Sequence, residues 1–197
     1  MNKLRTVVCF GLIAALALAA GCSDRGTNAG NVEGGGGLPP GKIAIVSRQS
    51  STNHIDLMDV DTSGIGSNPA RLTAESEPEN YPSWSPDGKR LVCQRAFNGA
   101  AVYVINADGT GQRRLSPTPG FDATPSWSLD GTRIIYVHLL QVPQPNKPPM
   151  TDIRVMNADG TGDHAILANT VFGVEPQWSV NDSIVFMSLM NGSKLDI

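Results

Sequence analysis

The sequence predicts an all-β protein, specifically a β-propeller made of four-stranded antiparallel blades, and three observations support this prediction. The three tryptophans, Trp84, Trp127 and Trp178, stand at the same place in a repeated segment. Asp-Gly pairs recur at two fixed places in that segment and separate short runs of apolar or alternating residues. Trp84 and Trp127 are 43 residues apart, which is a usual length for a propeller blade.

The Asp-Gly pairs predict tight turns between strands. In Ser85-Pro86-Asp87-Gly88 the proline fixes φ and the glycine accepts a positive φ, which suits a turn of this kind. A second pair lies in Asn-Ala-Asp-Gly-Thr-Gly, which occurs twice. Each tryptophan offers a large apolar surface for packing blade on blade, and its indole N–H can reach a polar partner. We therefore interpret the following residues as a structural repeat motif: Trp84, Asp87, Gly88, Asp108, Gly109, Trp127, Asp130, Gly131, Asp159, Gly160 and Trp178.

The apolar runs predict the remaining strands of each blade, whose first strand carries the tryptophan. Second strands are expected at Ile43–Ser47, Leu91–Arg95, Ile134–His138 and Ile184–Ser188. Third strands are expected at Ile55–Asp59, Ala101–Asn106 and Asp152–Asn157, with another beginning at Leu195. Fourth strands are expected at Arg113–Ser116 and His164–Ala168. The longer spacing from Trp127 to Trp178 comes from a proline-rich loop, residues 140–149, which leaves strand pairing intact.

The predicted strands make about three and a half blades, which is an incomplete ring. Three interpretations remain open at this point: the sequence is a fragment of a longer propeller, the chain completes a ring by self-association, or it persists as an open arc. Open blade edges favour self-association, because their backbone groups and apolar faces lack partners.

The first 41 residues predict export and a tether. Lys3 and Arg5 precede an apolar stretch that is too short to span a bilayer comfortably, so residues 1–21 are expected to be a signal peptide. The end of this stretch, Leu18-Ala19-Ala20-Gly21-Cys22, resembles a bacterial lipobox, which implies lipidation of Cys22 and a membrane anchor. The alternative is an ordinary secretory signal cleaved near Ala20. Residues 22–41 are rich in glycine and proline and predict a tether to the propeller at 42–197.

Composition and the scarcity of chemical motifs argue against several function classes. The chain has 15 Lys and Arg against 18 Asp and Glu and no basic run, so no nucleic-acid partner is expected. His54, His138 and His164 stand on or beside different strands, so no metal site and no cofactor are expected. Cys93 stands in a strand run and is expected to be a small core residue. We therefore expect no catalytic residues.

One end of a propeller is the natural place for a binding site. The loops between second and third strands share this end with the segments that enter each new blade, and loops on a rigid scaffold often carry function. The alternative is that these side chains only pack or solvate the linkers. The possible binding face consists of Glu79, Tyr81, Phe121, Asp122, Phe172 and Glu175.

The motifs Pro-x-Trp-Ser-x-Asp-Gly and Asn-Ala-Asp-Gly-Thr-Gly resemble the WD40-like propeller repeats of the TolB family, over residues 42–197. The resemblance implies a non-catalytic module in the cell envelope that binds an envelope protein or a peptidoglycan-associated partner. With the lipobox, it implies the periplasmic face of the outer membrane, because Ser23 follows Cys22. The alternative is the propeller portion of a larger enzyme, either a hydrolase related to prolyl oligopeptidases and dipeptidyl peptidases or a sugar-active lyase. The Gly-x-Ser-x-Gly motif of such hydrolases does not occur in the sequence.

Overall fold

The computed structural model describes part of the chain, and all regular secondary structure in that part consists of β-strands. Residues 1–40, which hold the predicted signal peptide and the predicted tether up to its last residue, Gly41, lie outside the described residues, as do Phe172 and the proline-rich stretch 141–148. No helix in the described part is long and apolar enough to cross a membrane. The described ranges are 41–49, 52–61, 66–67, 69–73, 77–96, 99–117, 120–140, 149–171, 174–179, 181–190 and 194–196.

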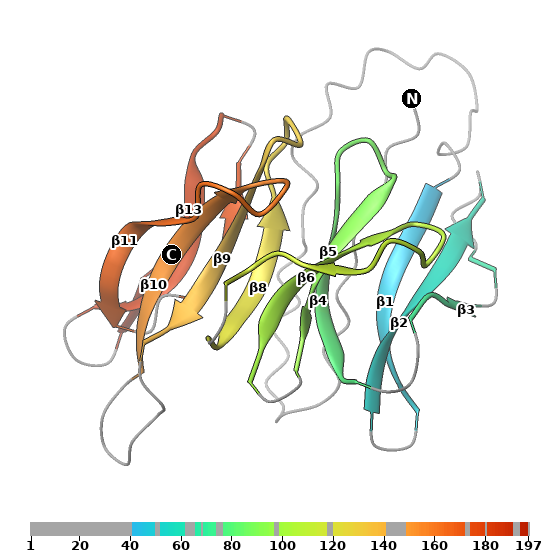
Figure 1. The fold of residues 1–197 in the computed structure, drawn as a ribbon, viewed down its shortest axis with the longest axis horizontal. Helices are drawn as coiled ribbons and strands as arrows, with labels where there is room; N and C mark the ends of the chain where they lie inside the picture. The colour runs from blue at the N-terminus through green and yellow to red at the C-terminus, as the bar shows by residue number, and fades with distance from the viewer. Residues whose placement is uncertain are drawn as a thin grey trace.

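The strands form four antiparallel sheets that follow one another in chain order (Figure 1). The first sheet contains β1 (Gly41–Gln49), β2 (Thr52–Val60) and β3 (Ala70–Arg71). The second contains β4 (Glu79–Trp84), β5 (Arg90–Arg95), β6 (Ala101–Asn106) and β7 (Arg113–Arg114). The third contains β8 (Asp122–Trp127), β9 (Arg133–Leu139), β10 (Met150–Asn157) and β11 (His164–Val171). The fourth contains β12 (Val174–Trp178), β13 (Ile184–Met190) and β14 (Lys194–Asp196).

This arrangement confirms the predicted fold class, an all-β propeller of antiparallel blades that forms only part of a ring. Most predicted strands lie within two residues of the observed ones, but the fourth strands differ. β7 ends at Arg114 instead of Ser116, because the N–H groups of Leu115 and Ser116 both point at the carbonyl oxygen of Val102, at 2.8 and 3.4 Å. β11 continues to Val171, three residues further than predicted.

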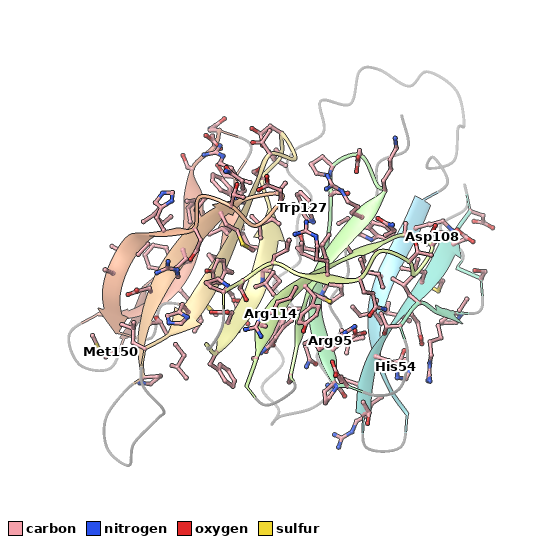
Figure 2. The ribbon with its side chains drawn as sticks, viewed as in Figure 1. His54, Arg95, Asp108, Arg114, Trp127 and Met150 are labelled. Carbon is pink, nitrogen blue, oxygen red and sulfur yellow. The ribbon has the colours of Figure 1, made fainter. Side chains whose placement is uncertain are left out.

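The hydrophobic core lies between neighbouring sheets, and each tryptophan is part of it. Trp127 packs with Val92 and Val104 of the second sheet and with Ile134 and Met156 of its own sheet. Figure 2 shows Trp127 near the end of the molecule where the Asp-Gly turns lie. The side chains on both sides of this interface are almost fully buried. No single sheet therefore encloses a core of its own.

The other two tryptophans repeat this packing. Trp84 joins Ala44 and Ile55 of the first sheet, and Trp178 packs against Ile135 and Ile153 of the third sheet. An arginine of the preceding sheet also covers the ring in two of the three cases. The guanidinium carbon of Arg90 lies 4.8 Å from the Trp127 ring centre, and that of Arg133 lies 4.5 Å from the Trp178 ring centre. The three indole N–H groups are buried with no hydrogen-bond partner among the described residues, so the polar contact expected for them is not found.

The Asp-Gly turns hold the sheets through short local hydrogen bonds. The Asp87 carboxylate accepts hydrogen bonds from the Ser85 hydroxyl at 2.6 Å and from the Lys89 N–H at 3.0 Å. Gly88 has a φ of 68°, and its N–H donates to the Ser85 carbonyl at 2.9 Å, which closes the turn. Asp130 makes equivalent contacts in the third sheet.

The second Asp-Gly turn of a sheet packs on the sheet before it. Gly160 has a φ of 88°, and a Cβ atom there would lie 3.0 Å from the backbone oxygen of Leu115 in the second sheet. The Arg113 guanidinium donates to the Asp159 carbonyl at 3.0 Å across the same boundary. Gly109 approaches the Leu72 carbonyl in the same way, also with a Cβ distance of 3.0 Å. These close approaches fix the spacing of neighbouring sheets.

Candidate functional site

The candidate site lies at the end of the sheets opposite the Asp-Gly turns. We call it the B–C rim, because it carries the loops between the second (B) and third (C) strands of the sheets, and define it as residues 77–81, 99–100, 120–124, 139–140 and 174–175. Figure 2 shows His54, Arg95 and Met150, which flank the loops at this end, away from Trp127. A parallel bridge between Ala100 and Phe121, with an N–H···O bond of 2.9 Å from Asp122 to Ala100, ties the second sheet to the third here. The rim is therefore continuous across a sheet boundary.

Every complete first strand is bulged at the rim. Tyr81, Thr124 and Glu175 each lie three residues before a tryptophan and have φ values of 52°, 49° and 53°. The strand pairing shifts register at these places in β4, β8 and β12. A positive φ is uncommon for residues other than glycine, and for a β-branched residue such as Thr124 it is an outlier. Such strained positions concentrate at ligand sites, so the repeated bulge marks this end of the first strands as a candidate for function.

The bulge residues of different sheets lie close enough to interact. β8 lies against both β4 and β12, so the three first strands are neighbours. Burial, and then the negative charge of Glu175, raise the pKa of the Tyr81 hydroxyl above its ordinary value. Tyr81 belongs to the second sheet and Glu175 to the fourth, so the rim brings together a phenol and a carboxylate that are far apart in sequence.

Two acidic residues of the predicted binding face are buried rather than displayed. Glu79 and Asp122 are each 1% exposed. Arg95 donates from Nε to the Glu79 carboxylate at 3.0 Å, and His138 Nδ1 lies 2.7 Å from the Asp122 carboxylate. Each pair joins the start of a first strand to the end of the neighbouring second strand, at the same register in both sheets.

Each of these carboxylates keeps one buried oxygen without a hydrogen-bond partner among the described residues, Oε2 of Glu79 and Oδ2 of Asp122. A buried charge of this kind is costly unless it is paired. The arginine and histidine contacts therefore hold the acids in place beneath the rim, and the acids hold the bulged strands in register.

The most exposed large side chains of the rim are apolar. Phe121 is 47% exposed and Leu140 is 38% exposed. The Leu139 N–H donates to the Phe121 carbonyl at 2.9 Å, so the two side chains come from adjacent backbone segments. An exposed aromatic ring and an exposed leucine on neighbouring, hydrogen-bonded segments offer apolar surface of the kind that binds another molecule.

The structure brings five of the six predicted binding-face residues to this end, and Phe172 lies outside the described residues. The binding-face residues predicted by name did not include Thr124, Leu140, Arg95 or His138, although Thr124 and Leu140 lie in segments that were expected at this end. Thr124 could have been found, because it occupies the Tyr81 position of the next repeat. Arg95 and His138 could not, because their roles depend on strand register.

Other residues considered from the sequence have structural surroundings. Cys93 is buried in the core beside Leu91 and Ile105, and burial strongly raises the pKa of its thiol. That environment disfavours the reactive thiolate. Within the described ranges, no group of three or more His, Cys, Asp or Glu side chains could hold a metal ion.

Comparison with known proteins finds no matching family model but does find individual relatives. The Tol-Pal system protein TolB of Bordetella pertussis is 27% identical, over 48% of this chain and 31% of its own length. A solved structure assigned as TolB from Agrobacterium tumefaciens superposes with a TM-score of 0.58 at 17% identity, over 74% of this chain and 53% of that one. A puromycin-hydrolyzing peptidase of Mycobacterium tuberculosis superposes with a TM-score of 0.50 at 21% identity, over 74% of this chain and 25% of that one.

These matches show the fold and its repeat type. The chain spans about a third of the length of the B. pertussis relative. The likeness to the peptidase shows that the same blades also occur beside hydrolytic activity. The repeated Trp and Asp-Gly register, the four antiparallel sheets and the TolB likenesses together identify the chain as a TolB-like β-propeller.

Proposed function

We propose that this chain is a non-catalytic binding module of the cell envelope, exported and anchored to the membrane through a lipid on Cys22. It binds an envelope protein or a peptidoglycan-associated partner through the B–C rim. The likeness to TolB of the Tol-Pal system supports the envelope setting. The lipobox-like stretch before Cys22 supports the anchor and, with Ser23, the periplasmic face of the outer membrane.

The observation that carries the proposal is the exposed pair Phe121 and Leu140 on the rim. Beside it, the bulged strands supply the Tyr81 hydroxyl and the Glu175 carboxylate, which add polar groups that orient a partner. Interfaces commonly combine an aromatic anchor with a polar surround. The paired acids Glu79 and Asp122 are part of the support under this surface.

The test is site-specific photo-cross-linking in living cells. A photoreactive phenylalanine analogue replaces Phe121 in one variant and Leu129 in the control. Leu129 is 55% exposed but lies at the turn end. We expect a cross-linked adduct from position 121 and none from position 129. The additional substitution Leu140→Ser should weaken the adduct.

The outcomes separate the possible partners. An adduct that collapses to a smaller size on muramidase digestion indicates peptidoglycan or a partner covalently attached to it, and one that resists digestion indicates a protein without a covalent link to peptidoglycan. Failure to obtain an adduct from position 121, or equal adducts from both positions, would rule out the rim as the binding surface.

A second candidate function is the propeller portion of a larger hydrolase, and the likeness to the puromycin-hydrolyzing peptidase supports it. In that case the rim would face a catalytic domain. The test is to read the coding sequence past Ile197. A Gly-x-Ser-x-Gly segment in the same reading frame supports this candidate, and further propeller repeats followed by a stop codon contradict it.

A further inference from the structure

The third sheet carries a carboxylate and an imidazole in direct contact at the B–C rim. His138 Nδ1 lies 2.7 Å from the carboxylate of Asp122, which is almost fully buried. An ionised carboxylate only accepts hydrogen bonds, so Nδ1 must carry the proton. In the neutral imidazole the second nitrogen, Nε2, then has no proton and acts as an acceptor. The buried acid therefore fixes the hydrogen-bonding role that His138 presents.

The Nε2 atom of His138 is left accessible. It has no hydrogen-bond partner among the described residues, and it is not one of the buried polar atoms that lack a partner. The side chain of His138 is 27% exposed. Glycine at position 120 leaves room for the pair, because a Cβ atom there would lie 3.1 Å from His138 Cε1 and 3.2 Å from both carboxylate oxygens of Asp122.

The equivalent position in the second sheet shows how His138 differs. Arg95 stands opposite Glu79 in that sheet, at the same register. The Arg95 guanidinium is occupied, because Nε donates to Glu79 at 3.0 Å and Nη2 donates to Gln112 at 2.6 Å. Its side chain is only 16% exposed. The same place thus holds a closed ion pair in the second sheet and a pair with a free nitrogen in the third.

Apolar side chains flank this nitrogen along the chain. Phe121 directly precedes Asp122, and Leu140 lies two residues after His138. Both are among the exposed large apolar side chains of the protein. A fixed polar group beside exposed apolar side chains suits a protein partner, whose own apolar side chains cover the surface and exclude water from the hydrogen bond.

We propose that His138 is the specificity-determining residue of the rim, and that its Nε2 atom accepts a hydrogen bond from an N–H or O–H group of a protein partner. Asp122 is a positioning residue, because it selects the tautomer and holds the ring. A partner without a donor at this place would leave Nε2 unpaired on binding and would be rejected. The inference rests on the proposed function, since it needs a protein bound at the rim. Its residues belong to the third sheet, whose first strand, β8, lies against both β4 and β12.

Nitrogen NMR tests the tautomer in the full chain, held in detergent micelles. The chain has 3 histidines, so labelling histidine alone with ¹⁵N gives three ring systems, and substituting each histidine assigns its signals. In alkaline buffer we expect a protonated Nδ1 and an unprotonated Nε2 at His138. The preference should be lost in Asp122→Asn, because an amide can donate as well as accept. A protonated Nε2 in the parent chain, or an unchanged preference in Asp122→Asn, would overturn the proposal.

The photo-cross-linked adduct from position 121 tests the contact in cells. The yield should fall at least tenfold in His138→Phe, which keeps a ring but removes the acceptor. His138→Gln should retain most of the adduct, since the amide oxygen of glutamine also accepts. His164→Phe is the matched control, because it makes the same change at an exposed histidine beside an Asp-Gly turn, and it should leave the yield unchanged.

The outcomes separate this inference from the proposed function. No adduct in the parent chain would overturn both. An adduct that persists in His138→Phe, or falls equally in His138→Gln, would overturn the role of the acceptor but leave the rim as the binding surface. An adduct that contains peptidoglycan and no protein would overturn the assignment to a protein partner. Circular dichroism checks the folding of each variant; should Asp122→Asn not fold, the parent tautomer and the two His138 variants still decide.

Discussion

Replacing Thr124 with glycine should stabilise the protein, although glycine within a strand usually destabilises. Thr124 has a φ of 49°, and its hydroxyl is buried without a hydrogen-bond partner among the described residues. Holding a residue other than glycine in this region costs about 1–3 kcal/mol. Leaving a buried hydroxyl unpaired costs about 1–3 kcal/mol. Both penalties disappear in Thr124→Gly.

Two opposing effects reduce the gain. Glycine loses more backbone freedom on folding, at a cost of about 0.5–1 kcal/mol. Loss of the methyl group of the half-buried Thr124 costs at most about 0.8 kcal/mol. We expect a net increase of about 1–2 kcal/mol in the free energy of unfolding. Ala123→Gly is the control, because the neighbouring Ala123 pairs regularly with Val137 and should lose about 0.5–1 kcal/mol.

The assay is urea unfolding followed by circular dichroism, with the midpoint and slope fitted for both variants and the parent chain. A gain for Thr124→Gly together with a loss for Ala123→Gly supports the strain at the bulge. If both substitutions destabilise to the same extent, the bulge stores no strain, and the argument that marks it as a functional feature is wrong.

Three further predictions concern the turns and the anchor. In urea unfolding, Gly160→Ala should lower the free energy of unfolding by about 1–3 kcal/mol more than Gly131→Ala. Both positions have a positive φ, but only the alanine Cβ at position 160 would press on a neighbouring backbone. Equal losses would contradict the close approach of the sheets. Hydrogen bonds from hydroxyl and backbone groups of the turn around Asp130 lower the pKa of its carboxyl from 3.8 to about 2. The contribution of Asp130 to stability should therefore be complete above pH 4 and should disappear as pH falls towards 2. In acid titrations, the stability of Asp130→Asn should change less over this interval. Cys22→Ser should abolish labelling by a palmitate analogue, whereas a parent chain that takes up no label would refute the lipid anchor.

The fold was predictable because its signals are local and repeated. Trp84 and Trp127 stand in one register with Asp-Gly turns after them, and the strand Ala101–Asn106 has the same bounds in the prediction and in the structure. Repetition also revealed the insertion before Met150. A turn needs only neighbouring residues to specify it, so a sequence pattern suffices.

The site was less predictable because its geometry depends on contacts between distant segments. Nothing in the letters around Tyr81 or Glu175 signals a positive φ, since neither is glycine or asparagine. Glu79 and Asp122 look like surface acids in the sequence. Their burial follows from strand register, which places Arg95 and His138 directly opposite them. The short fourth strand at Arg113–Arg114 likewise results from two N–H groups competing for one carbonyl.

The shared core between sheets sets the order in which a growing chain can fold. Val92 and Val104 emerge with the second sheet, but Trp127, which completes their core, emerges 43 residues after Trp84. At a synthesis rate of about 5–20 residues per second, a few seconds pass between the synthesis of a sheet and the synthesis of the tryptophan that covers its apolar face. Each newly made sheet therefore passes through an interval with one apolar face uncovered, and chaperones that shield such faces would act with the period of the repeat.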